Sequence, residues 1–164
     1  CEAVKLATHS EYSHVGIIFE DEGKWMVYEA VQPVKKTPLK DWINHGEDGQ
    51  YVVKRLKNAK KVLTKQILEE MQTLGETLLG KNYDIYFNWS NDEIYCSELV
   101  WKIYDEAAGI HIGELKELKD FDLTSQAVRE IMAERYGNSI PLEEKVIAPS
   151  DLFDSKKLVL VDQQ

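Results

Sequence analysis

Two strand-like segments joined by a short loop constrain the fold of this chain more than any other feature. "HVGIIFE" (14–20) and "WMVYEAV" (25–31) are rich in β-branched and aromatic side chains, and the loop "DEGK" between them contains the glycine that hairpin loops favour. We therefore predict two antiparallel strands. Further strands are predicted in "YVVKRL" (51–56), "KVIAP" (145–149) and "KLVLV" (157–161), and Ser150 is expected to cap a short turn between the last two.

Helical periodicity is strongest after Thr64, a suitable N-cap, and ends at Gly80. Apolar side chains recur between them at spacings of four, three and four residues, at Ile67, Met71, Leu74 and Leu78. Other helices are predicted over residues 2–9, 37–46, 96–109 and 124–137, with Thr37 capping the second and Pro38 at its first position. Because strands and helices are mixed rather than strictly alternating, we predict an α+β fold with an antiparallel sheet packed against helices.

Length and charge limit the classes of protein and partner. At 164 residues the chain fits one domain (1–164), and its net charge of −9 argues against binding nucleic acid or an anionic membrane surface. No apolar run approaches the roughly 18 residues that a membrane-spanning helix needs. The sequence opens inside helix-like "CEAVKLATHS", so we expect that an N-terminal segment is missing.

The cysteines and histidines do not predict a metal site. Two cysteines allow at most one disulfide, and the four histidines show no metal-ligand spacing with them. We therefore expect no metal and no cofactor. The oligomeric state is left open.

Cys96 is a candidate nucleophile because of where it stands. "SNDE" (90–93) is typical of a loop and "CSELVWKIY" (96–104) is helix-periodic, so Cys96 falls in the first helical turn. There the free backbone N–H groups and the positive end of the helix dipole favour a thiolate, and the same N–H groups could receive an oxyanion. The alternative is a small buried side chain in the core, and spacing alone favours that alternative.

His14 and Glu29 are candidates for the base and for the group that orients it. His14 opens the first hairpin strand, and Glu29 is a carboxylate within the otherwise apolar second strand. Each has an ordinary alternative: a solvent-accessible histidine at a strand edge, and a glutamate that faces solvent. Local pattern does not decide between these readings.

A family resemblance bears on the candidate roles of Cys96, His14 and Glu29. "GKNYDIYFNWSNDEIYCSELVWKIY" (80–104) resembles the cysteine segment of NlpC-type cell-wall peptidases, in which the catalytic histidine normally follows the cysteine. Here the matching histidine comes first, in "THSEYSHVGI" (8–17), and "VYEAV" (27–31) follows it. This order resembles the circularly permuted branch of the superfamily, the YiiX-like permuted papain-like amidases, and the likeness covers most of the chain.

The resemblance implies a papain-like fold with permuted connectivity and a role for each matching residue. It implies Cys96 as nucleophile, His14 as base, Glu29 as third polar member and Tyr83 as a residue beside the cysteine that orients substrate or oxyanion. It also implies an amidase or peptidase acting on a small peptide-like or acylated substrate in a bacterial periplasm or cell envelope. Two alternatives stay open: hydrolysis or transfer of lipid acyl esters with the same residues, and a binding module without activity.

Overall fold

The computed structural model describes residues 2–164, and its largest sheet is three-stranded and antiparallel. The sheet has the order β1-β2-β3, with β1 at Gly16–Asp21, β2 at Lys24–Glu29 and β3 at Lys35–Pro38. The predicted hairpin is confirmed, because β1 and β2 pair throughout, from Gly16 opposite Glu29 to Asp21 opposite Lys24. This register sets Glu29 at the end of the sheet that adjoins His14.

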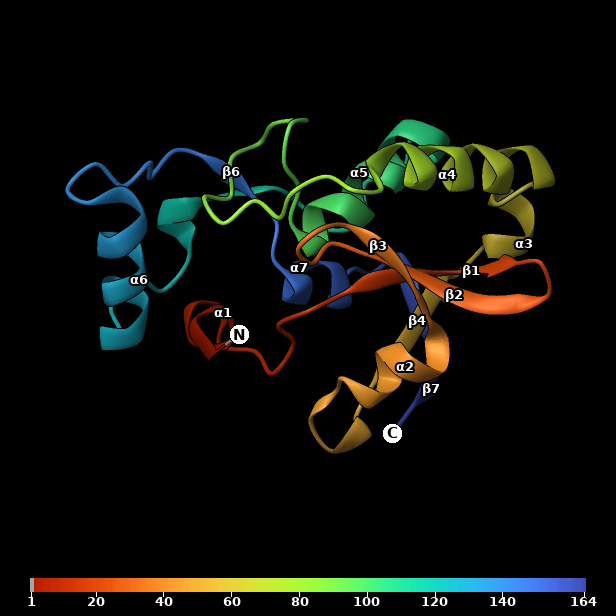
Figure 1. Cartoon of the computed structure of the whole chain (residues 1–164), viewed down its shortest axis with the longest axis horizontal. Helices are drawn as coiled ribbons and strands as arrows, with labels where there is room; N and C mark the ends of the chain where they lie inside the picture. Colours follow the sequence, from red (N-terminus) through yellow and green to blue (C-terminus); the bar gives the residue numbers. More distant parts are fainter. Residues whose placement is uncertain (1) are drawn as a thin grey trace.

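Two long helices cover one face of this sheet (Figure 1). α4 spans Lys65–Leu78 and α5 spans Cys96–Ala108, as the apolar periodicity predicts. α4 begins where the Thr64 side chain accepts a hydrogen bond from a backbone N–H of the first turn, and α5 ends at Gly109 with φ 62°. α4 approaches the sheet closely at Gly75, where an added Cβ would lie only 2.6 Å from the buried ring of Tyr28.

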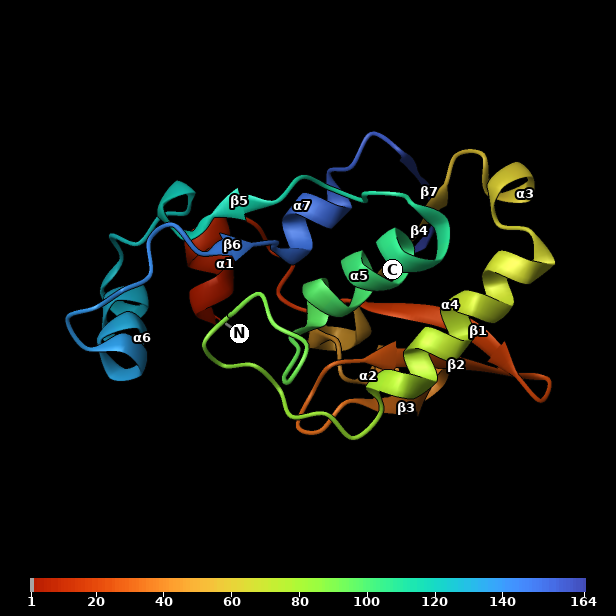
Figure 2. The ribbon, with the colours of Figure 1, turned by 90° about the horizontal axis from the view of Figure 1, so that it is seen from above.

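The remaining elements lie around this core. α1 (Glu2–Thr8) packs against α6 (Gln126–Tyr136) at one end of the molecule, away from the sheet (Figures 1 and 2). Two short antiparallel pairs join β4 to β7 and β5 to β6. The bounds of the other elements are α2 Leu39–Asn44, η1 Glu47–Gly49, β4 Val52–Leu56, α3 Ala59–Val62, β5 Lys116–Glu117, η2 Leu118–Asp120, β6 Lys145–Val146, α7 Pro149–Phe153 and β7 Leu158–Gln163.

Two capping predictions were wrong. Thr37 belongs to β3, where it pairs with Val27 of β2, and α2 begins at Leu39, with Pro38 as an N-cap that makes no side-chain bond. Pairing with β2 satisfies the backbone hydrogen-bonding groups of this segment, and this tertiary contact outweighs the local sequence pattern that favours a helix start. Ser150 lies inside α7 rather than capping a turn, and the helix begins after Ala148, whose N–H donates to Asp151 at 2.8 Å.

Candidate active site

Cys96 is the first residue of α5, and the surrounding chain fixes this helix start from both sides. The preceding Tyr95 is extended and its N–H donates to the Glu98 carboxylate at 3.2 Å, which closes the first turn. Cys96 is only 4% exposed. The backbone groups of Val15 and Ser97 are close enough to the sulfur to lower the pKa of the thiol.

His14 and Glu29 meet beside this sulfur. His14 lies just before β1 and its Nε2 is 2.7 Å from Oε2 of Glu29 at the end of β2. The second oxygen of Glu29 accepts from the Thr37 hydroxyl at 2.5 Å, and the carboxylate is 2% exposed. His14 is also close enough to the side chain of Cys96 for the two groups to shift each other's pKa, raising that of His14 and lowering that of Cys96. Because Glu29 engages Nε2, the nitrogen left for the sulfur is Nδ1.

The electrostatics of this cluster favour an ion pair. Burial alone lowers the pKa of His14, but its hydrogen bonds and charge interactions with Cys96 and Glu29 outweigh burial and raise that pKa from 6.5 to about 9. Burial opposes a Cys96 thiolate, yet the hydrogen bond to His14, the imidazolium charge and the two backbone donors leave the pKa of the thiol below its ordinary value. The pKa of Glu29 is also lowered, because hydrogen bonds from His14 and Thr37 outweigh its burial. At neutral pH these directions favour thiolate, imidazolium and carboxylate in a row.

Tyr83 also lies close to Cys96, and both residues line the same cavity. It forms a parallel bridge with Ile94, and its N–H donates to the side chain of Gln32 at 2.7 Å. Burial, followed by the charge of and the hydrogen bond to Cys96, raises the pKa of the phenol well above 10, so it remains a donor at neutral pH. The neighbouring Asp84 is fully buried and accepts from the backbone of Tyr86 at 2.7 Å, which holds the loop after Tyr83.

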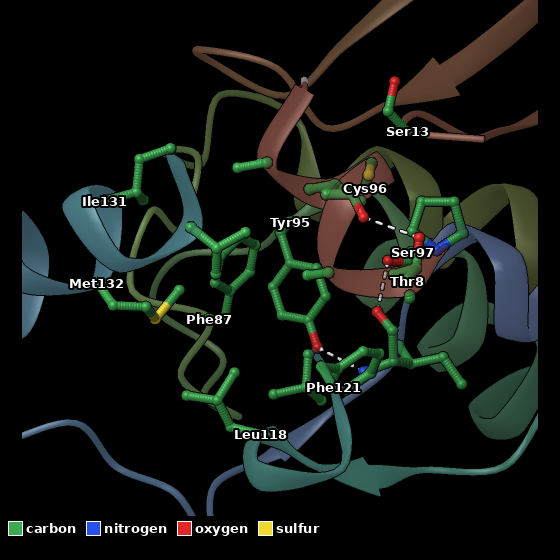
Figure 3. Close-up of a pocket in the computed structure, with 18 of the residues that line it drawn as sticks. Thr8, Ser13, Phe87, Tyr95, Cys96, Ser97, Leu118, Phe121, Ile131 and Met132 are labelled. Atoms are coloured by element: carbon green, nitrogen blue, oxygen red, sulfur yellow. Dashed lines mark hydrogen bonds between the residues drawn. The ribbon is translucent and has the colours of Figure 1, made fainter. Parts of the chain in front are cut away.

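A cavity of about 310 Å³ opens beside Cys96 (Figure 3). α1, α6, the start of α5 and the segment before α7 enclose it, and Figure 3 shows Ile131 and Met132 of α6 across from Cys96. Its walls are mainly apolar. The lining residues are Ala3, Val4, Ala7, Thr8, Ser13, Tyr83, Phe87, Tyr95, Cys96, Ser97, Leu118, Phe121, Leu123, Val128, Ile131, Met132, Arg135, Val146, Ile147, Ala148 and Pro149.

The structure therefore brings together the four residues singled out in the sequence: Cys96, His14, Glu29 and Tyr83. Sequence reasoning missed Thr37, the second partner of Glu29, because "KTP" was interpreted as a helix start. It also missed the cavity, whose walls come from segments far apart in the chain. The available signal for Thr37 was its place eight residues after Glu29 in a segment able to form a third strand.

Comparison with known proteins shows the family and the fold of the chain. Residues 2–162 match the model of a family described as "Permuted papain-like amidase enzyme, YaeF/YiiX, C92 family". The chain belongs to this permuted papain-like amidase family. It is 48% identical over 166 residues to the uncharacterized protein YiiX of Escherichia coli K12, an alignment that covers 99% of this chain and 79% of that protein. The predicted fold, α+β and papain-like with permuted connectivity, is confirmed.

A solved structure of the same family superposes closely. It is the crystal structure of a protein described as metalloprotein yiiX from Escherichia coli O157:H7, with 46% identity, a TM-score of 0.93, and coverage of 99% of this chain and 89% of that one. In the chain described here, residues 2–164 contain no group of three or more His, Cys, Asp and Glu side chains placed to hold a metal ion. Nor does this part of the chain contain a helix long and apolar enough to cross a membrane.

Proposed function

We propose that this chain is a thiol hydrolase that cleaves an amide bond through Cys96, His14 and Glu29. The observation that carries the proposal is the continuous chain of contacts from sulfur to imidazole to buried carboxylate, with the 2.7 Å bond between His14 and Glu29 at its centre. A buried carboxylate that orients an imidazole, which in turn activates a nucleophile, is the arrangement that acyl transfer requires. Membership of a family of amidases supports the same reaction class.

The mechanism follows from the positions of these groups. The Cys96 thiolate attacks the substrate carbonyl carbon, and the oxyanion that forms is stabilised by N–H groups at the start of α5 and by the Tyr83 hydroxyl. The carbon–nitrogen bond then breaks, and the proton on His14 passes to the leaving amine. Water, deprotonated by His14, attacks the thioester, which releases the carboxylic acid and restores the cysteine. Glu29 keeps the imidazole in place through both steps.

The place and partners of the reaction are part of this proposal. By resemblance we infer a small peptide-like or acylated substrate and a bacterial periplasm or cell envelope, with no role for nucleic acid. The main alternative in another class is a ligand-binding module without turnover. A Cys96→Ser variant separates the two, because an enzyme loses turnover whereas a binding module keeps its ligand.

The experiment that tests the proposal is the pH dependence of Cys96 alkylation by iodoacetamide. Cys1 is replaced by serine, so that Cys96 is the only thiol, and the rate is compared with that of His14→Ala. We expect fast alkylation at pH values well below the ~8.5 of a free cysteine, and an upward shift of the midpoint in His14→Ala. His111→Ala is the control, since His111 is a surface residue bonded to Asp105 at 2.8 Å. An unreactive thiol, or one that titrates normally whether or not His14 is present, refutes the proposal.

A further inference from the structure

The pairing of β4 with β7 brings two basic segments of the chain together, away from α1 and α6 (Figures 1 and 2). Residues 52–65 contain β4 and α3 and include six basic residues and no acidic one. Residues 155–161 contain two lysines, just before β7, and again no acidic residue. The N–H of Lys57 donates to the carbonyl of Lys157 at 2.9 Å, so the two segments adjoin in the folded chain. Their charges therefore form one surface that neither segment forms by itself.

Most of these basic side chains face solvent. On β4, Leu56 is 3% exposed and packs in the core, whereas its neighbours Arg55 and Lys57 are exposed. Successive side chains of a strand point to opposite faces, so Arg55 and Lys57 lie on the face turned away from the core. We call the exposed basic residues of the two segments the basic face: Arg55, Lys57, Lys60, Lys61, Lys156 and Lys157.

The charges of the basic face are not neutralised within the described part of the chain. None of its six residues takes part in a salt bridge there. Lys157 donates to the carbonyl of His111 at 2.9 Å, a neutral acceptor that leaves its charge in place. Lys65, at the edge of the region, pairs with Glu69 at 3.7 Å and is therefore not counted in the face. A group of unpaired like charges attracts anionic partners.

β7 adds exposed apolar side chains beside these charges. Val159 pairs with Arg55 across the two strands, and Val159, Leu160 and Val161 are all exposed, Leu160 by 52%. This combination fits a bilayer surface, where lipid phosphates meet the cations and apolar side chains enter the boundary between headgroups and acyl chains. A nucleic acid or an acidic peptide would use only the charges and leave three large apolar side chains in water. The apolar side chains therefore favour the membrane among anionic partners.

We propose that the basic face and the exposed apolar side chains of β7 dock this protein on a membrane surface that contains anionic lipids. The net charge of −9 argues against such a surface only if charge is spread evenly over the molecule. At physiological ionic strength, charges are screened beyond ~8 Å, so acidic residues on other faces weaken this contact little. The proposal concerns a surface away from Cys96 and does not depend on thiol hydrolysis.

The proposal is tested by sedimentation of the protein with vesicles. The probes are vesicles of phosphatidylcholine alone and vesicles that also contain phosphatidylglycerol, an anionic lipid. The Cys96→Ser variant is used, so that no thiol chemistry alters the lipid. We expect binding to the anionic vesicles and little binding to phosphatidylcholine alone. Raising the salt from ~0.05 M to ~0.5 M should release most of the bound protein, because the attraction between charges is screened.

A matched pair of variants connects this binding to the basic face. Lys60→Gln with Lys61→Gln removes two of its charges from α3, and should weaken binding about 25-fold, at roughly fivefold for each basic residue near an anionic surface. Arg129→Gln with Lys145→Gln removes two exposed charges from α6 and β6, and should leave binding unchanged. Val159→Thr replaces an exposed methyl group by a hydroxyl, and should weaken binding about threefold.

Four outcomes overturn the proposal. The first is a protein that stays in solution with anionic vesicles at low salt. The second is equal binding to both kinds of vesicle, which would mean that the basic face is not involved. The third is an equal loss of binding in the two double variants. The fourth is binding to duplex DNA or polyglutamate, weakened by the α3 variant, in a protein that does not bind anionic vesicles, since the partner would then be an acidic polymer.

Discussion

Replacing the Glu29 carboxylate by an amide should lower the pKa of His14 substantially. In the parent, that carboxylate is 2% exposed and bonds to His14 at 2.7 Å, so the imidazolium has a charge-assisted partner shielded from water. Such a bond contributes about 1.5–3 kcal/mol, and one pH unit corresponds to 1.36 kcal/mol. Glu29→Gln should therefore lower the apparent pKa of His14 from about 9 by about one to two units. The amide is nearly isosteric, so Thr37 keeps an oxygen to which it can donate.

NMR of the imidazole protons between pH 5 and 10 measures this shift directly. The His14 resonance is identified by its loss in His14→Asn. Glu20→Gln is the control, because it removes an exposed carboxylate from the neighbouring strand β1 with the same chemical change. We expect the His14 pKa in Glu20→Gln to stay within a few tenths of the parent value. If Glu29→Gln leaves the pKa near 9, or if both variants lower it equally, Glu29 is not what sustains the imidazolium.

Three other substitutions test separate parts of the structure. Burial raises the pKa of Glu98 to about 7, so the folded state favours the protonated form of this side chain. The contribution of this group to the free energy of unfolding is therefore fully present below pH ~4.5, and it is lost as the pH rises through 7. In the parent, the free energy of unfolding measured with urea should fall by ~3 kcal/mol between pH 4 and 8, and in Glu98→Gln this fall should be absent. A parent protein that shows no such fall contradicts the prediction. Tyr83→Phe should slow acylation of Cys96 by esters about tenfold to a hundredfold with little change in its alkylation, and equal losses in both point to a packing role. Gly75→Ala should destabilise the fold by about 1–2 kcal/mol, because the new methyl meets the Tyr28 ring, and a gain in stability would mean that helix propensity wins.

The elements that sequence alone predicted are those whose local pattern agrees with their tertiary environment. The β1–β2 hairpin has strand-forming residues around a glycine loop, and α4 has both a cap and an unbroken apolar stripe. Cys96 and Gly109 mark the two ends of α5 for the same reason, since the loop residues before it and the glycine after it act locally. For these segments, local preference and packing lead to the same structure.

The rest depended on contacts between distant segments. Thr37 followed by Pro38 is a good helix start in isolation, and only the neighbouring β2 makes it a strand residue that reaches Glu29. The cavity is even harder than the role of Thr37 to predict from local sequence, because its lining residues Ala7, Met132 and Ile147 come from three separate parts of the chain. The residue pattern of a single segment therefore could not predict that these residues form one cavity.

The order of these segments along the chain has a consequence for biosynthesis. His14 and Glu29 belong to one hairpin near the start of the chain. Cys96 comes much later and acquires its lowered pKa only when α5 packs beside β1. Until then its sulfur lacks the imidazolium and behaves as an ordinary thiol. In a chain with this connectivity, Cys96 is therefore no more reactive than an ordinary thiol until α5 has packed beside β1.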